Sequence, residues 1–193
     1  MNQPILRRRC LLLAGLVAFV AACTQEPAPQ EPFSVVDASI PEIQQALDDG
    51  RVTSRELVEQ YLQRIATYEL ELNATLAVNP AALALADELD AERRAGKLRG
   101  PLHGIPVALK DNIQTLDMPT TGGAVAFEGF MAPYEATIVE NLRNAGAIIL
   151  AKTTLTELAN WVATGMPDNY NALRGYGMNP YDPRRDPRDG FDD

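Results

Sequence analysis

The sequence predicts an α/β protein with a largely parallel sheet flanked by helices, because helical and strand-like segments alternate along it. Two short apolar runs, residues 105–109 and 147–151, are typical of buried strands, and each is followed by a lysine. Segments with helical periodicity lie before, between and after these runs. The composition, 46% hydrophobic and 22% charged over 193 residues, is that of a globular domain with a core.

The N-terminus is typical of an export signal. Arg7, Arg8 and Arg9 precede an apolar segment at 11–22, whose 12 residues are too few for a bilayer, which takes about 20. Small residues before Cys23 resemble a bacterial lipobox. We therefore expect lipidation of Cys23, export to the cell envelope and membrane anchoring, on the periplasmic or outer surface. The alternative is an ordinary cleaved signal with an incidental cysteine.

Three regions follow from this division: a signal peptide at 1–22, a proline-rich tether at 23–36 and a domain at 37–193, with folded structure beginning near Phe33. The net charge is −9, from 17 basic and 26 acidic residues. A nucleic-acid partner would need clustered lysine and arginine, so we expect none.

Two helices open the domain, and each is predicted by a capping box. Ser39 with Glu42 begins a short helix that stops at 49–50, and Thr53 with Glu56 begins a longer one. The longer helix carries an apolar stripe at positions 57, 58, 61, 62 and 65, which is a core face.

The elements that follow alternate between strand and helix. Residues 75–79 favour an edge strand, and Pro80 begins an alanine-rich helix that runs to about residue 94. After the 105–109 strand come a turn-rich loop at 118–123, a helix at 137–144 and the 147–151 strand. We expect a further helix over 156–159, capped by Thr153 or Thr154. From residue 165 to 193 no helical or strand period remains.

Lys110 stands where the first apolar run ends, and Asp111 and Asn112 follow it. It is either a solvated strand-end lysine or a catalytic base, because burial lowers the pKa of an amine enough for it to accept a proton. Asp111 and Asn112 either orient that amine or solvate a turn. His103, the single histidine, has no partner motif, so we expect a structural role for it. A hydrolase centred on His103 would need a nearby nucleophile, and the sequence offers none.

The segment 100–113, Gly-Pro-Leu-His-Gly-Ile-Pro-Val-Ala-Leu-Lys-Asp-Asn-Ile, closely resembles the N-terminal signature region of the amidase signature hydrolases. Other segments follow in the order that the family has, and the resemblance covers roughly residues 37–190. These segments are the helix after Thr53, Leu72-Asn73-Ala74, Thr121-Gly122-Gly123, Ala136-Thr137, Lys152-Thr153 with Glu157-Leu158-Ala159, and Asn179-Pro180-Tyr181-Asp182.

This resemblance implies a Ser–cis-Ser–Lys triad that hydrolyses carboxamide or amide C–N bonds of a small-molecule substrate, without a metal or organic cofactor. Lys110 would be the base that acts on the bridging serine. The residues themselves show no metal-ligand spacing or phosphate loop either. For Lys152 the family offers no triad role, and we expect a structural role near the site.

The family's two serines lie beyond the landmark at 179–182, whereas Ser34, Ser39 and Ser54 are the three serines of this chain. We therefore expect the N-terminal, incomplete part of an amidase domain, which holds the base without its relay or nucleophile and is inactive alone. The alternative is a non-catalytic, truncated lipoprotein that at most binds a partner.

Overall fold

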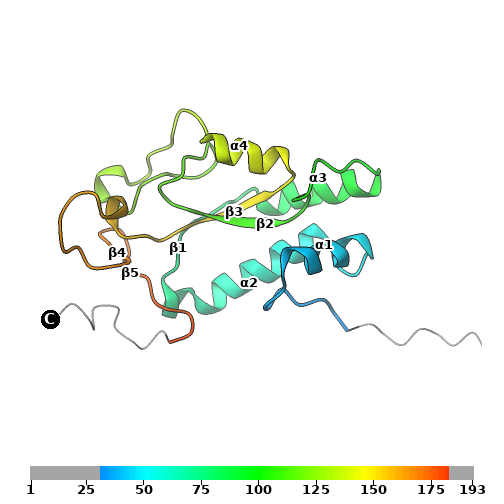
Figure 1. The fold of residues 1–193 in the computed structure, drawn as a ribbon, viewed down its shortest axis with the longest axis horizontal. Coiled ribbons are helices and arrows are strands. Elements are labelled where there is room, and N and C mark those ends of the chain that lie inside the picture. The colour runs from blue at the N-terminus through cyan, green and yellow to red at the C-terminus, as the bar shows by residue number, and fades with distance from the viewer. Residues whose placement is uncertain (1–30, 183–193) are drawn as a thin grey trace, which may run out of the picture. The chain divides into compact units, whose positions relative to one another are not determined.

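The computed structural model describes residues 31–182. The predicted signal, Cys23 and the chain beyond residue 182 lie outside this range. The described part contains a three-stranded sheet with helices packed on both of its faces (Figure 1). β1 (Thr75–Val78), β3 (Ile148–Thr153) and β2 (Pro106–Lys110) lie side by side in that order. β2 is parallel to β3 and β1 is antiparallel to it, so these strands form a mixed sheet with one pair of each kind.

The first two helices begin where the capping boxes predict. α1 (Ile40–Asp48) follows Ser39, whose backbone N–H donates to Glu42 Oε2 at 2.8 Å. α2 (Ser54–Leu72) follows Thr53, whose backbone N–H donates to Glu56 Oε2 at 2.8 Å. α3 (Ala82–Arg94) is the predicted alanine-rich helix, and α4 (Thr137–Asn144) has the bounds that its sequence predicts. No helix within 31–182 is long and apolar enough to cross a membrane.

The two faces of the sheet carry separate apolar clusters. One lies beneath α2 and α3, and the other beneath α4 and the loop after β2. The first includes Val58, Ala86, Leu89, Ile148 and Leu150, and the second includes Leu109, Met118, Val139 and Ile149.

A β-bulge in β3 interrupts this alternation. Val107 pairs with Ile149, but the next residue of β2, Ala108, pairs with Ala151, so Leu150 is an extra residue in β3. Leu150 and Ala151 consequently both belong to the cluster beneath α2 and α3. Because side chains alternate along a strand, this bulge turns Lys152 toward the opposite face.

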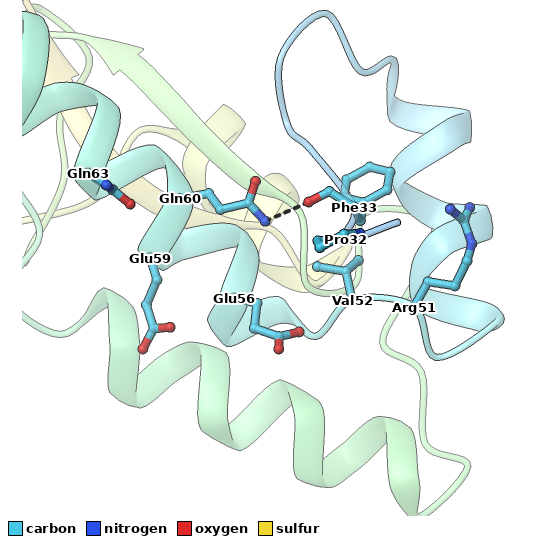
Figure 2. A pocket seen from close by; sticks show the side chains of 8 residues that line it. All are labelled: Pro32, Phe33, Arg51, Val52, Glu56, Glu59, Gln60 and Gln63. Carbon is cyan, nitrogen blue, oxygen red and sulfur yellow. Dashed lines mark hydrogen bonds between the residues drawn. The ribbon is translucent and has the colours of Figure 1, made fainter. Parts of the chain in front are cut away.

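The end of the predicted tether is already packed. Gln60 of α2 accepts from Val35 N at 3.1 Å and donates to Phe33 O at 3.1 Å, the second bond being drawn in Figure 2. Val35 is buried in a cluster with Leu47 and Leu57. The side-chain amide of Gln60 satisfies both backbone groups, as a neighbouring peptide would. Folded structure therefore begins near Phe33, so the last residues of the segment predicted as a tether pack against α2.

The predicted helix over 156–159 was wrong. η2 (Glu157–Asn160) is a short 3-10 turn in which Leu158 and Ala159 have φ of 48° and 54°. Of the two hydroxyls that were expected to cap a helix, that of Thr154 has another partner, since its Oγ1 accepts from Asn171 Nδ2 at 2.8 Å. Leu158 N donates instead to Gly122 O at 2.7 Å, which holds the turn against the glycine loop.

A small hairpin follows in the region where the sequence showed no strand period. β4 (Tyr170–Asn171) pairs with β5 (Gly175–Tyr176), and each strand has only two residues, too few for a period to be visible. Asn73, at the end of α2, donates through Nδ2 to Arg174 O at 2.7 Å and to Tyr176 O at 2.9 Å. These bonds attach the hairpin to α2. A further short 3-10 turn, η1 (Val125–Phe127), lies in the loop between β2 and α4.

Candidate active site

Lys110 is the last residue of β2 and pairs with Thr153 of β3. Within the described part, β2 has a strand on one side only, so it is an edge of the sheet. Leu109 points into the core, whereas Ala108 and Lys110 are exposed. The burial that was expected for a lysine base is therefore not supplied by this part of the chain. A closed site would need further groups to cover the β2 edge.

Asp111 is fixed in place immediately after Lys110. Its backbone N–H donates to Thr153 O at 3.1 Å, and its side chain is 1% exposed. Its Oδ2 accepts from Thr121 N at 2.9 Å and also from the Thr121 hydroxyl. Asn112, the second candidate, is exposed. Of the two residues expected near Lys110, only Asp111 therefore belongs to a buried polar network.

Lys152 is the buried lysine of this region, with an exposed fraction of 0%. Its Nζ donates to Pro119 O at 3.0 Å and to Thr120 Oγ1 at 3.0 Å, and it lies 3.5 Å from Asp111 Oδ1. Burial lowers the pKa of the Lys152 ammonium, and the charge of Asp111 partly opposes that effect. One signal in the sequence marks this site, a lysine that closes an otherwise apolar run.

The loop at 121–123 joins this network through its backbone. Gly123 N donates to Thr121 Oγ1 at 3.0 Å, so the hydroxyl that reaches Asp111 also holds the loop. Gly123 has φ of 77°, and a Cβ there would lie 2.6 Å from Asn171 Cβ. Only glycine therefore lets the loop approach the hairpin so closely. Asn171 is itself fully buried and donates to Leu155 O at 3.1 Å.

A small hollow lies beside Asp111. Its volume is about 180 Å³, and its lining includes Asp111, Thr121, Glu128 and Arg174. A second hollow of about 260 Å³ opens between the N-terminal segment and α2, as Figure 2 shows, and its lining does not include Lys110. Among the described histidine, cysteine, aspartate and glutamate side chains, no group forms a metal-binding cluster.

His103 has a backbone partner at each ring nitrogen. Nδ1 accepts from Arg99 N at 3.1 Å, which leaves Nε2 to donate to Leu89 O at 2.9 Å. The ring is 3% exposed, and Gly146 lies against its backbone, where a Cβ would come within 2.6 Å of His103 Cα. Nδ1 thus closes the 99–103 turn on itself, and Nε2 joins that turn to Leu89 of α3. This geometry supports the structural role and gives no support to a hydrolase centred on His103.

Comparison with known proteins identifies the class to which this architecture belongs. The model of the Amidase family matches residues 56–187. The chain therefore belongs to the amidase family, and its α/β fold is part of the fold of amidase signature enzymes.

Similarity to individual amidases supports this family assignment. The chain is 38% identical over 157 residues to a putative amidase of Schizosaccharomyces pombe, covering 80% of this chain and 27% of the relative. It is 40% identical over 152 residues to a probable amidase of Arabidopsis thaliana, covering 77% and 30%. The native peptide amidase from Stenotrophomonas maltophilia superimposes with a TM-score of 0.74 at 42% identity, covering 78% and 31%. The chain thus spans less than a third of the length of these relatives.

Proposed function

We propose that this chain carries the lysine side of an amide-hydrolysing active site, with Lys110 as the base. The observation that supports this most directly is the placement of Lys110. It ends β2 beside the buried Asp111 and the 121–123 loop, in a chain of the amidase family. In the proposed reaction the Lys110 amine takes a proton from a bridging serine. That serine takes one from a nucleophilic serine, whose oxygen attacks the carboxamide carbon. The C–N bond then breaks as a proton passes back from Lys110 through the bridging serine to the leaving amine, and the acyl group stays on the nucleophile until water hydrolyses it.

The serines of this chain all lie at or before the start of α2. Ser39 caps α1, Ser54 is buried at the start of α2, and Ser34 lies in the N-terminal segment ahead of α1. We therefore propose that the relay and the nucleophile come from outside residues 1–193, and that this chain alone does not turn over amides. The exposure of Lys110 supports this proposal, because covering the β2 edge would provide the desolvation that a lysine base requires.

A chimera tests the role of Lys110. Residues 33–182 would replace the matching part of the Stenotrophomonas maltophilia peptide amidase, and amide hydrolysis would be followed by product release. We expect activity that Lys110→Ala lowers by about a thousandfold or more. Lys97→Ala, a change at another exposed lysine, is the matched control and should retain activity. A folded chimera whose hydrolysis survives Lys110→Ala would contradict the proposal.

The purified full chain tests the predicted inactivity. We expect no hydrolysis of a panel of simple amides above the rate in buffer. Turnover that Lys110→Ala abolishes and Lys97→Ala preserves would refute the expectation that the chain is inactive alone.

We also propose that the chain is exported and lipidated at Cys23. The support is the sequence alone, in which a basic and apolar leader ends in small residues before this cysteine. Cys10, the only other cysteine, provides the matched control. In a bacterial host fed an alkyne-labelled fatty acid, the wild type and Cys10→Ala should take up label, and Cys23→Ala should not. Equal labelling of Cys23→Ala would exclude this site.

The second candidate is a non-catalytic remnant that binds a partner, and the open edge of β2 favours it. An edge strand presents unpaired backbone groups to any segment that can add as a strand. A calorimetric scan of the full chain distinguishes a module that folds on its own from a piece that needs a partner to fold. A sharp, cooperative transition would indicate a self-sufficient module, and broad, weakly cooperative melting would indicate a piece that needs a partner to complete its core.

A further inference from the structure

Lys152 and Asp111 form a buried charged pair next to Lys110, the residue that we propose as the base. Lys152 and Asp111 are 0% and 1% exposed, and their charged atoms Nζ and Oδ1 are 3.5 Å apart. Each also has partners outside the pair. Lys152 reaches Pro119 and Thr120, and Asp111 accepts from Thr121 N. The pair therefore joins three consecutive residues of the loop to the end of the β2 strand.

The β-bulge at Leu150 places the Lys152 side chain beside Asp111. Without the extra residue at Leu150, Lys152 would follow the alternation of β3 and face α2 and α3. The bulge turns it instead toward the loop that contains Pro119 and Thr120. Bulges that redirect a side chain are enriched beside active sites.

Stability alone is a weak reason for such a pair. Burying two charges carries a desolvation cost that their attraction often fails to exceed, and apolar residues of similar size can be as stable. What the pair provides is a single arrangement of the groups around it. It fixes Asp111, whose peptide is the one directly after Lys110, and it fixes the 119–121 backbone that leads into the two glycines.

We propose that Lys152 is a positioning residue, which acts through Asp111 to hold the strand end that carries Lys110 and the 119–123 loop in one geometry. This inference rests on the proposed role of Lys110. It assigns Lys152 no contact with substrate and no proton transfer. Its ammonium donates to oxygen atoms on the loop, and its charge balances the buried carboxylate of Asp111.

The lysine content of the chain makes a direct test possible. Lys97, Lys110 and Lys152 are the three lysines, so a full chain labelled with ¹³C,¹⁵N-lysine gives one side-chain Hε–Cε signal from each. Uniform ¹⁵N labelling adds hydrogen exchange at the amides of Asp111 and Thr121. Lys97 lies just after α3, outside the network, and serves as the internal reference. None of these measurements requires turnover, so they can fail or succeed independently of the amidase proposal.

Lys152→Met keeps the length of the side chain and removes its charge. We expect the Lys110 signals to move while those of Lys97 stay, and exchange at Asp111 N and Thr121 N to become roughly tenfold faster or more. Amides of α2 and α3 should keep their protection. If all these quantities keep their wild-type values apart from a change in melting temperature, Lys152 only fills the core and the proposal is overturned.

Asp111→Asn provides the second variant, because it preserves shape and an oxygen for Thr121 N while removing the carboxylate charge. We expect it to move the signals of both Lys110 and Lys152 and to leave Lys97 unchanged. If Lys152→Met does not fold, these readouts on Asp111→Asn decide the question. Unchanged Lys110 signals in a folded Asp111→Asn chain would overturn the proposal.

Discussion

Asp90 offers a sharp test of how the helices are joined. This residue of α3 is 7% exposed, and its two carboxylate oxygens accept from the first backbone N–H groups of α2. Asp90 Oδ1 accepts from Ser54 N at 2.8 Å, and Oδ2 accepts from Arg55 N at 3.1 Å. Thr53 Oγ1 accepts from the next donor, Glu56 N, at 3.1 Å. A carboxylate from a second helix thus completes the cap that the sequence predicted for α2.

Asp90→Ala should lower the free energy of unfolding by about 3 kcal/mol, because it leaves two helix-terminal donors without an acceptor, removes charge-assisted bonds and removes an anion from a helix N-terminus. For a domain of this size the melting temperature should fall by about 6–12 °C. Asp90→Asn keeps one acceptor and should cost roughly half as much.

Asp87→Ala is the matched control. Asp87 lies on the same helix and pairs with the Arg55 guanidinium at 2.7 Å, but its side chain is 56% exposed. Removing it should cost between about 0 and 1 kcal/mol. Urea unfolding followed by circular dichroism, with a constant m-value, measures all three variants. If Asp90→Ala costs no more than Asp87→Ala, the capping argument is refuted.

Further outcomes are expected at Gly104, Ser54, His103 and Lys152. Gly104→Ala should cost about 3 kcal/mol, because Gly104 has φ of 83° and a Cβ would overlap Ser54 Oγ. Ser54→Ala should be nearly neutral in urea unfolding, since that buried hydroxyl has no hydrogen-bond partner, and it should partly rescue Gly104→Ala. His103→Ala should cost about 2–4 kcal/mol by losing two backbone partners, and His103→Gln less. Burial lowers the pKa of Lys152 below its ordinary 10.5, so the unfolded chain holds more protons just below that pH. The stability of the wild type relative to Lys152→Met should therefore rise as the pH increases toward 10.5, and a constant difference would refute this.

The elements that the sequence predicted correctly are those with local signals. The two capping boxes and the apolar stripe fix α1 and α2 through contacts between near neighbours in sequence, and short apolar runs locate β2 and β3. The helix expected over 156–159 does not form, because the backbone conformation there depends on hydrogen bonds to residues far away in the sequence. Leu158 N donates to Gly122 O, and Asn171 Nδ2 donates to the hydroxyl oxygen of Thr154.

In the candidate site too, the sequence predicted the features that have a local signal and missed one that depends on strand register. The sequence placed Lys110 where its strand ends, and β2 does end at Lys110. It left open whether Asp111 orients that amine or solvates a turn, and in the structure Asp111 is buried. It could not show that Lys152 is the buried lysine, because that depends on one extra residue in β3. A bulge shifts the facing of every residue after it, and no periodicity at 147–151 reveals it.

The bond between Asn73 and the hairpin has a consequence for synthesis. Asn73 Nδ2 meets Arg174 O across 101 residues of chain, and Met178 N reaches Leu72 O at the same helix end. At a synthesis rate of about 5–20 residues per second, the end of α2 waits about 5–20 s for these partners. During that interval the Leu72 carbonyl and the Asn73 side chain lack these partners, so a chaperone can reach the end of α2 before the hairpin covers it.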